Sequence, residues 1–294
     1  MDSSPTCTTS QEAVDAIHSP KVKEMDQDDL PDIVTNKALL KCERLGDKQL
    51  SQVWRYNATT VIKRVDPPSA ARAEAAAMAL AYQKASVPVP RVLKTVIPES
   101  DEEGGYGIIF MQYIDGTNLE DFWPTASDDD KTRILGQLRD LISQLRGIEG
   151  AFIGSVDGSV CNDQLFANRE HPYGPYKDDA AFRVGIAQSL RACEANAFTE
   201  VVVGMINTMP SSERLVLTHG DLVPRNILVK DSNIVGLVYW EMAGFYPEYW
   251  EYAKAHFFVD YDHPWHADRA VENVLKAYPL ELAVLLHTRG IYMY

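Results

Sequence analysis

Residues 217–229, LTHGDLVPRNILV, place three polar side chains at fixed spacing between two apolar runs. His219 is followed two positions later by Asp221, and Asn226 comes five positions after that. The apolar runs favour short strands, whereas the glycine and proline between them favour a loop. The segment therefore predicts a loop, anchored by buried strands, that presents a carboxylate and an amide.

This loop carries the side chains that phosphoryl transfer requires. Asp221 is the candidate catalytic base, since a carboxylate there can accept a proton from a substrate hydroxyl. Asn226 could give an amide oxygen to a magnesium ion, or it could only cap the turn that follows Pro224. His219 is a further catalytic candidate, although bracing the loop through hydrogen bonds is the stronger interpretation. Arg225 could contact a substrate or pair with a nearby carboxylate.

Several segments together resemble one known family. These are HGDLVPRNILV, VYWEMAGFYPEYWEYAKA, SVPVPRVL at 86–93, IIFMQYIDGTNLEDFWP at 108–124 and IGSVDG at 153–158. The chain resembles the aminoglycoside phosphotransferase family over roughly residues 36–290, and its fungal members above all. The resemblance implies a bilobal, protein-kinase-like α+β fold and ATP- and magnesium-dependent phosphorylation of a small-molecule hydroxyl.

The order of predicted elements fits such a fold. Residues 34–114 are expected to form a small β-rich lobe with one main helix at 69–85, capped by Ser69. Residues 115–294 are expected to form a larger, mainly helical lobe, with a helix starting at Ser127. Residues 1–33 are polar and acidic and are expected to be a mobile tail or a short helix. Further helices are predicted at 178–208, 249–258, 267–277 and 279–288.

Two charged residues in the small lobe match the nucleotide machinery of the family. Lys63 lies in the β-rich run TTVIKRV and Glu74 in the helix that follows. The resemblance assigns them to the lysine that holds phosphates and the glutamate that orients it. Each could instead be a solvated surface charge. Strand alternation should turn the neighbouring Arg64 to the opposite face.

Two further regions would complete a nucleotide site. Met111 and Tyr113 should lie at the junction of the lobes, where main-chain groups could pair with an adenine edge. A buried strand without a ligand is the alternative. The segment 46–54 should cover the phosphates, but GDKQLSQVW contains a single glycine, and backbone amides approach phosphates most easily where side chains are absent.

One position departs from the family pattern. The family places a metal-binding aspartate in a D-W-E string, and this chain reads Tyr239-Trp240-Glu241. A phenol with an ordinary pKa near ~10 is neutral at pH 7 and binds magnesium poorly. Loss of ~4 kcal/mol of metal stabilisation would slow phosphoryl transfer roughly a thousandfold. Glu241 could replace the missing carboxylate, but the family already carries this glutamate. Val223, where fungal relatives often carry histidine, removes another polar group.

The composition and charge of the chain limit the classes of partner that it is expected to bind. Lys plus Arg number 28 and Asp plus Glu 42, a formal net charge of −14, which argues against nucleic acid or an anionic membrane. The four cysteines show no CxxC pair, and neither a signal peptide nor a membrane span is visible, so we expect a cytoplasmic protein. His256, His263 and His266 are unevenly spaced for zinc. The aromatic residues that follow are expected to be mainly core rather than substrate pocket: Phe245, Tyr246, Tyr249, Trp250, Tyr252, Phe257, Phe258, Tyr261 and Trp265.

Two main functions remain open. The first is an active phosphotransferase that uses Asp221, Asn226, Lys63 and Glu74. The second is a diverted member that binds a metabolite or catalyses a metal-free step such as proton transfer or cyclisation, with Asp221, His219 and Tyr239 as acid and base candidates. The sequence favours the second slightly, because neutral Tyr239 is a poor magnesium ligand. A pseudokinase that only binds a partner is a weaker third possibility.

Overall fold

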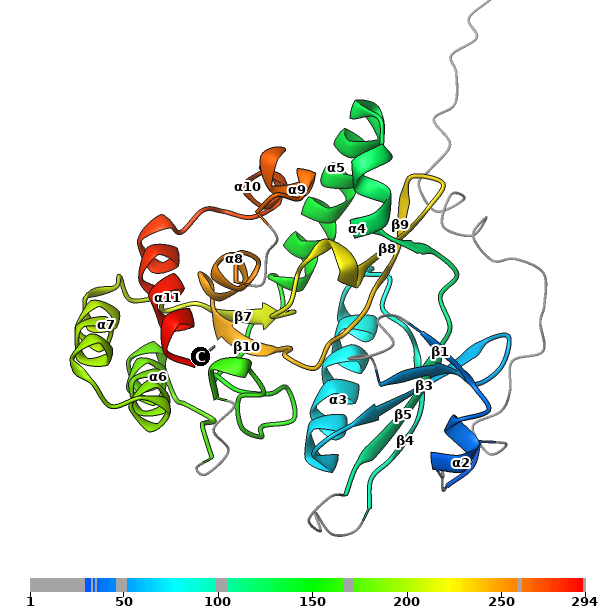
Figure 1. Cartoon of the computed structure of the whole chain (residues 1–294), viewed down its shortest axis with the longest axis horizontal. Helices are drawn as coiled ribbons and strands as arrows, with labels where there is room; N and C mark the ends of the chain where they lie inside the picture. The colour runs from blue at the N-terminus through cyan, green and yellow to red at the C-terminus, as the bar shows by residue number, and fades with distance from the viewer. Residues whose placement is uncertain are drawn as a thin grey trace, which may run out of the picture.

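The computed structural model describes residues 30–32, 34, 36–45, 52–98, 105–166, 172–257 and 261–292. A five-stranded sheet and one long helix form the smaller lobe, and helices with two short sheets form the larger one (Figure 1). The bilobal α+β fold is thus confirmed. Of the predicted tail 1–33, only residues 30–32 are described, and Leu30 packs beneath the sheet with Ile62 and Phe110.

The small-lobe sheet is antiparallel, with strand order β1-β2-β3-β5-β4. Helix α3 lies close against it because its inward residues are mostly alanines, and a Cβ at Gly107 would lie 2.5 Å from the Cβ of Ala71. The elements are α2 Asn36–Leu39, β1 Glu43–Leu45, β2 Val53–Arg55, β3 Thr60–Val65, α3 Pro68–Lys84, β4 Val92–Val96 and β5 Gly107–Gln112.

The predicted cap of α3 is wrong. The helix begins at Pro68, its N-cap is Pro67, and no side chain caps it. Proline at the first helical position has its φ already set and lacks an N–H that would need a partner, so it displaces the start from Ser69. The Ser127 cap is correct: its hydroxyl accepts a hydrogen bond from the backbone of Asp130.

The larger lobe carries two short sheets, β7 with β10 and β8 between β6 and β9. They hold the segments on either side of the predicted catalytic loop. Its elements are β6 Thr117–Asn118, α4 Leu119–Phe122, η2 Trp123–Thr125, α5 Asp128–Leu145, η3 Gln164–Phe166, α6 Asp179–Cys193, α7 Ala197–Thr208, β7 Leu215–Thr218, η4 Pro224–Asn226, β8 Ile227–Lys230, β9 Asn233–Leu237, β10 Gly244–Pro247, α8 Trp250–Lys254, α9 Pro264–Ala267, α10 Ala270–Val274 and α11 Pro279–Tyr292.

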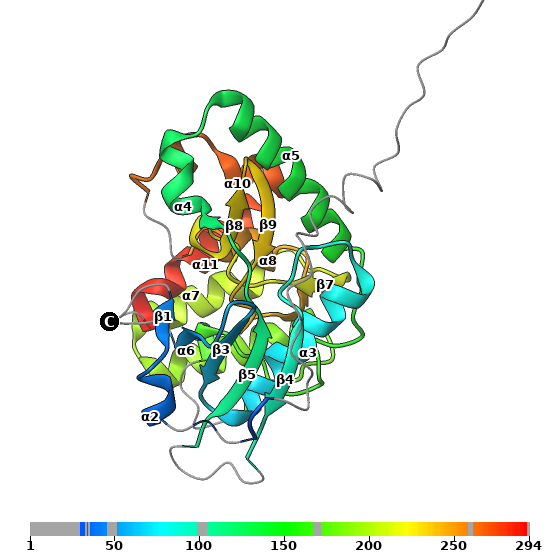
Figure 2. The ribbon, with the colours of Figure 1, turned by 90° about the vertical axis from the view of Figure 1, so that its right-hand side faces the viewer.

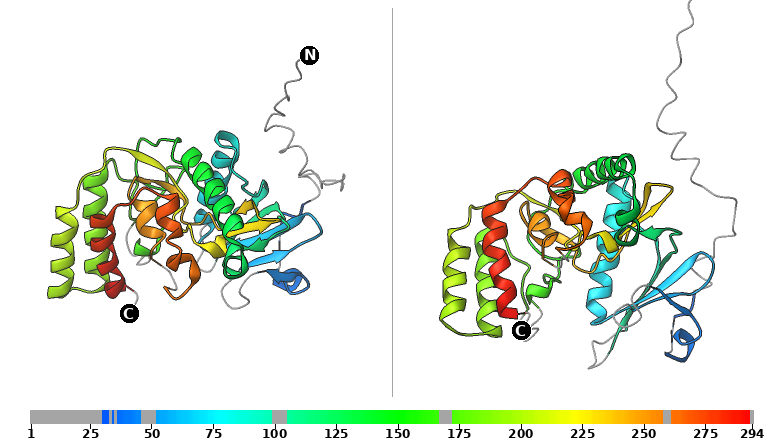
Figure 3. Two further views of the ribbon diagram at one scale, coloured as in Figure 1. Left: turned by 90° about the horizontal axis from the view of Figure 1, so that it is seen from above. Right: turned by 45° about the horizontal axis from the view of Figure 1, so that its top comes forward.

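Several predicted helices have different bounds. The run 178–208 divides into α6 and α7, because Asn196 adopts an extended conformation and caps α7 through its side chain. The run 267–277 is also broken, since Arg269 has a left-handed backbone with φ of 53° just before α10. Helices α6, α7 and α11 lie together at the end of the molecule farthest from β1–β5 (Figure 3). Figure 2, which is viewed from the side of the small lobe, shows α6 and α7 behind its strands.

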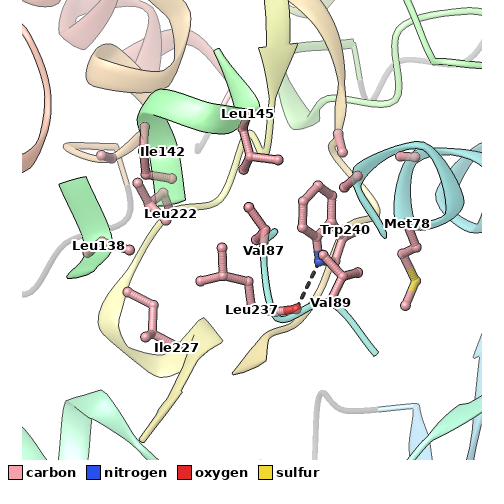
Figure 4. Close-up of a cluster of buried hydrophobic side chains, with 14 of the residues drawn as sticks. Met78, Val87, Val89, Leu138, Ile142, Leu145, Leu222, Ile227, Leu237 and Trp240 are labelled. Carbon is pink, nitrogen blue, oxygen red and sulfur yellow. Dashed lines mark hydrogen bonds between the residues drawn. The ribbon is translucent and has the colours of Figure 1, made fainter. Parts of the chain in front are cut away.

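One hydrophobic core runs through both lobes. Val87 and Val89, which follow α3, pack among side chains of α5 and the segment after β9 (Figure 4). The backbone N–H of Leu237 also donates to the Pro88 carbonyl at 2.8 Å. Trp240 lies in this core and donates its indole N–H to the Leu237 carbonyl at 2.9 Å. Tyr239 and Glu241 are the chain neighbours of Trp240. The core therefore fixes the position of both residues relative to the small lobe.

The expectation that the C-terminal aromatic residues form core is confirmed for most of them. Tyr246, Trp250 and Phe257 are fully enclosed, and Phe245, Tyr249, Tyr252 and Trp265 are also buried. Tyr261 is exposed, and Phe258 lies outside the described residues. Packed rings therefore stabilise this lobe, and they leave little room for a substrate pocket among themselves.

Candidate functional site

The predicted catalytic loop joins β7 to the short helix η4. His219 is fully buried: its Nε2 atom lies 3.0 Å from the Val238 carbonyl, and its Nδ1 accepts from the Asp221 backbone N–H at 3.3 Å. Gly220 has φ of 80°, and a Cβ there would lie 2.6 Å from the Met242 carbonyl oxygen. With both ring nitrogens occupied, His219 braces the loop.

Glu251 holds the same loop from α8. Its carboxylate accepts hydrogen bonds from the backbone N–H groups of His219, at 2.6 Å, and Gly220, at 3.0 Å. Glu251 is buried, so these two donors replace the water that a carboxylate would otherwise need. Sequence reasoning did not single out this residue. A charged side chain within the aromatic string YPEYWEYAKA was the available signal, because a buried charge needs a partner.

Asp221 is held in place by its loop neighbours. Asn226 donates from Nδ2 to the Asp221 side-chain oxygen at 2.7 Å and to its backbone carbonyl at 2.8 Å. The Arg225 guanidinium lies 3.3 Å from the other carboxylate oxygen. The predicted base and the predicted metal ligand therefore contact each other, and the amide nitrogen of Asn226 faces the carboxylate.

Lys63 lies at the centre of the charged group between the lobes. Its ammonium forms ion pairs with Glu74 at 2.7 Å and with Glu241 at 3.1 Å. Strand β3 and helix α3 carry the first pair, as predicted, whereas Glu241 arrives from the Tyr-Trp-Glu segment. The predicted orientation of Arg64 is also correct, because its guanidinium stacks on Tyr106, 4.0 Å from the ring centre.

The two glutamates respond differently to the shared lysine. Burial lowers the pKa of Lys63, but the charges of Glu74 and Glu241 outweigh it and the pKa is raised. The positive charge of Lys63 lowers the pKa of Glu241. Burial raises the pKa of Glu74 despite the lysine beside it. Glu241 is therefore the firmly ionised partner, and two carboxylates compete for one ammonium.

Tyr239 lines the inter-lobe cavity beside this group. The ammonium of Lys63 is 5.2 Å from the centre of the Tyr239 ring, within cation–π range. The backbone of Tyr239 is left-handed, with φ of 65°, which is uncommon for a bulky residue and costs of order 1–3 kcal/mol. The surrounding core imposes this conformation, so the side chain stays beside the lysine.

A cavity of about 280 Å³ opens between the lobes. Met111 and Tyr113 line it, as predicted for the lobe junction, together with Lys63, Glu74 and Tyr239. Most of the remaining wall is apolar. It consists of Leu45, Val53, Val61, Met78, Pro90, Gln112, Ile114, Gly116, Asn118, Arg225, Leu228 and Val238. Residues 46–51 of the predicted phosphate-covering loop lie outside the described residues.

The residues beside the cavity do not fit a magnesium ion held in the manner that the resemblance implies. A phenol takes the place of the aspartate. Asn226 binds Asp221 through its amide nitrogen, which leaves its side-chain oxygen as the one suitable ligand of the implied pair. The carboxylate of Glu241, which follows Tyr239 by two residues, is paired with Lys63. Across the described part of the chain, no three His, Cys, Asp or Glu side chains are grouped to hold a metal ion.

Val223 and the histidines considered for zinc lie outside the cavity. His256 contacts the rings of Tyr252 and His266, while His263 caps α9 and lies 3.0 Å from the Glu120 carbonyl. Burial lowers the pKa of His256, with Glu272 opposing the shift. Val223 is buried within the segment that joins β7 to η4.

Sequence reasoning also missed a second ion pair. Lys254 on α8 donates to Asp163 at 3.0 Å, and Trp250 donates to the same carboxylate at 3.3 Å. The adjacent Asn162 donates to the backbone carbonyl of Glu241 at 2.6 Å. These partners lie far apart along the chain, so no local pattern could have paired them.

Comparison with models of known protein families supports the kinase-like fold. Residues 41–283 match the phosphotransferase enzyme family. No curated protein matches. In the described residues, no helix has the length and apolar character needed to cross a membrane.

Solved structures of aminoglycoside phosphotransferases have the same fold. A thermostable mutant of APH(4)-Ia in its apo form is 15% identical with a TM-score of 0.60, covering 88% of this chain and 91% of that one. The streptomycin–ATP–APH(2")-IIa ternary complex is 14% identical with a TM-score of 0.53, covering 96% and 87%. Because the match to the family extends over most of the sequence, this chain belongs to the phosphotransferase enzyme family.

Proposed function

We propose that this protein binds a small molecule in the inter-lobe cavity and has been diverted from magnesium-dependent phosphoryl transfer. The observation that carries the proposal is Tyr239, which lines the cavity with its ring 5.2 Å from the Lys63 ammonium. A neutral phenol supplies no anionic oxygen to a hard cation, and its ring occupies space beside the lysine that would receive phosphates.

The charges around Lys63 support the same function. An ATP phosphate binds such a lysine through its own negative charge. Here Glu74 and Glu241 already surround the ammonium, so a phosphate would have to displace Glu241 or lie against its charge. A ligand without an anionic group at this position meets neither obstacle.

The remaining chemistry near the cavity is acid–base chemistry. Asp221 is buried and is not among the residues that line the cavity, but Arg225, which contacts its carboxylate, does line it. Asn226 and Arg225 orient Asp221, which could accept a proton from a molecule bound beside Arg225. A metal-free proton transfer or cyclisation fits this arrangement better than phosphoryl transfer does. His219 is buried behind the loop and would act only by bracing it.

A second candidate is an active ATP-dependent phosphotransferase of a small-molecule hydroxyl. It is favoured by the Lys63–Glu74 pair at 2.7 Å and by the Asp221–Asn226 contact, both of which fit the arrangement that the family resemblance implies. It requires Glu241 to leave Lys63 and bind the metal.

Calorimetry with ATP in the presence and absence of magnesium distinguishes the two functions. We expect that magnesium does not strengthen ATP binding to the natural protein and that no ATP is consumed with small-molecule alcohols. We expect Tyr239→Asp to gain at least about tenfold in magnesium-dependent ATP affinity, because it restores an anionic ligand.

Tyr239→Phe is the matched control, since it keeps the ring and adds no charge. It should behave like the natural protein. Micromolar, magnesium-dependent ATP binding with phosphate transfer by the natural protein would overturn the proposed function in favour of the active enzyme.

A further inference from the structure

Glu241 needs an anchor to remain on Lys63. Its side chain is 43% exposed, whereas that of Lys63 is buried, so water competes with the ammonium for the Glu241 carboxylate. Its backbone, however, is held firmly. The Asn162 side chain donates to the Glu241 carbonyl at 2.6 Å, across 79 positions of sequence.

Asn162 is fixed in turn by the residue beside it. The Asp163 carboxylate is buried and accepts from Lys254 at 3.0 Å, from Trp250 at 3.3 Å and from the Leu165 backbone at 3.0 Å. Both side-chain donors come from α8, the helix whose Glu251 also holds the catalytic loop. Asn162 thus projects toward Glu241 from a segment with little freedom to move.

The neighbouring backbone adds to this restraint. Gly154, earlier in the same loop, exchanges two backbone hydrogen bonds with Phe245, at 2.9 and 3.1 Å. Phe245 follows Glu241 by four residues. The loop therefore holds the Tyr-Trp-Glu segment both at Glu241 itself and just beyond it.

We propose that Asn162 is a positioning residue, anchored by the buried Asp163–Lys254 pair, that keeps Glu241 on Lys63 and makes the cavity select ligands without an anionic group. The inference rests on the proposed function and deepens it by naming the ligand class. Two like charges a few ångströms apart repel strongly where water is scarce. A phosphate or carboxylate brought to Lys63 therefore meets Glu241, whereas an uncharged ligand does not.

The test measures binding of inorganic tripolyphosphate by calorimetry with excess EDTA, so that no metal takes part. We expect weak binding by the natural protein. Glu241→Gln should bind at least about tenfold tighter, because the charge competing for Lys63 is removed. Asn162→Ala should gain roughly threefold to tenfold, since its Glu241 is no longer held in place.

A double-mutant cycle separates positioning from a general structural effect. If Asn162 acts through Glu241, adding Asn162→Ala to Glu241→Gln should leave affinity within about twofold of Glu241→Gln alone. Asn196→Ala is the matched control: it removes an asparagine that caps α7, at the far end of the larger lobe (Figure 1). It should bind tripolyphosphate like the natural protein.

Three results would overturn the inference: no gain in Glu241→Gln, no gain in Asn162→Ala, or a gain from Asn162→Ala that persists without Glu241. The assay contains no magnesium and no ATP. Active phosphoryl transfer by the natural protein would therefore refute the proposed function in a separate experiment. A failed cycle would leave the Tyr239 observation standing.

Discussion

Lys63 and Lys254 are both buried lysines paired with carboxylates, but they face different surroundings. Lys63 is 4% exposed and lines the inter-lobe cavity with Glu74, while its second partner, Glu241, is 43% exposed. Lys254 is 1% exposed, and its partner Asp163 is enclosed with it beside Trp250 and Phe257. One ammonium borders a space that a ligand can enter, and the other is surrounded by packed side chains.

The difference shows how the role of a buried charge can be inferred. A ligand cannot reach an ion pair that is enclosed by aromatic rings. Such a pair affects the stability of the fold and the position of neighbours such as Asn162. A pair at a cavity wall can exchange partners when a ligand arrives. The second carboxylate on Lys63 therefore matters for binding, whereas the indole on Asp163 matters for folding.

The largest expected effect comes from removing each lysine. Lys254→Met should lower the free energy of unfolding by about 3–5 kcal/mol, because Asp163 stays buried without its positive partner. Lys63→Met should lower it by only about 1–3 kcal/mol, since Glu241 can turn to water and the cavity admits water to Glu74. Urea denaturation of both variants measures the two losses.

Equal losses would break the comparison, because the cavity would then provide no relief for the unpaired glutamates. A double variant, Lys254→Met with Asp163→Leu, serves as the control for the core pair. It removes both charges and should recover part of the lost stability. No recovery would mean that Lys254 acts through packing alone.

Protonation of His256 is expected to have a smaller effect on stability. This side chain is buried, but among the described residues no carboxylate lies close enough to form a strong ion pair with it. Its Nε2 atom lies 3.9 Å from Glu272, and burial lowers its pKa below 6.5. The unfolded chain therefore takes up the proton first as pH falls. The contribution of His256 to stability is complete above pH 6.5 and is lost as pH falls through its lower folded-state pKa.

Thermal unfolding between pH 8 and pH 5 should detect this loss. His256→Gln should show a shallower decline in melting temperature than the natural protein over that range. His287→Gln, at an exposed position on α11, should decline as the natural protein does. Parallel curves for all three proteins would show that His256 is not protonated in the way that its burial implies.

The smallest effect is expected at the surface. Arg191 and Glu200 form an ion pair at 2.7 Å with both side chains exposed, so water and salt screen the attraction. Arg191→Ala should leave the urea midpoint unchanged within error. If Arg191→Ala lost as much stability as Lys63→Met, solvent exposure would not explain the different contributions of the three ion pairs to stability.

The sequence alone was enough for the features with local patterns. The spacing of His219, Asp221 and Asn226 predicted a loop between a strand and a turn. His219 and Asp221 do lie between β7 and η4, and Asn226 is the last residue of η4. Residues of strand β3 and helix α3 lie near each other in the chain, and Lys63 and Glu74 do form the expected pair. Ser127 caps its helix because capping depends on atoms three residues away.

Only the tertiary structure decided what surrounds these residues. Glu241 meets Lys63 across 178 positions, and Lys254 meets Asp163 across 91. Neither contact has a local signature. The first depends on how the Tyr-Trp-Glu segment packs through Trp240, and the second on how α8 packs against the loop before η3 through Trp250. The sequence showed that a tyrosine replaces the aspartate. Only the fold showed that a second glutamate forms an ion pair with the lysine, because long-range packing determines which charges share a buried site.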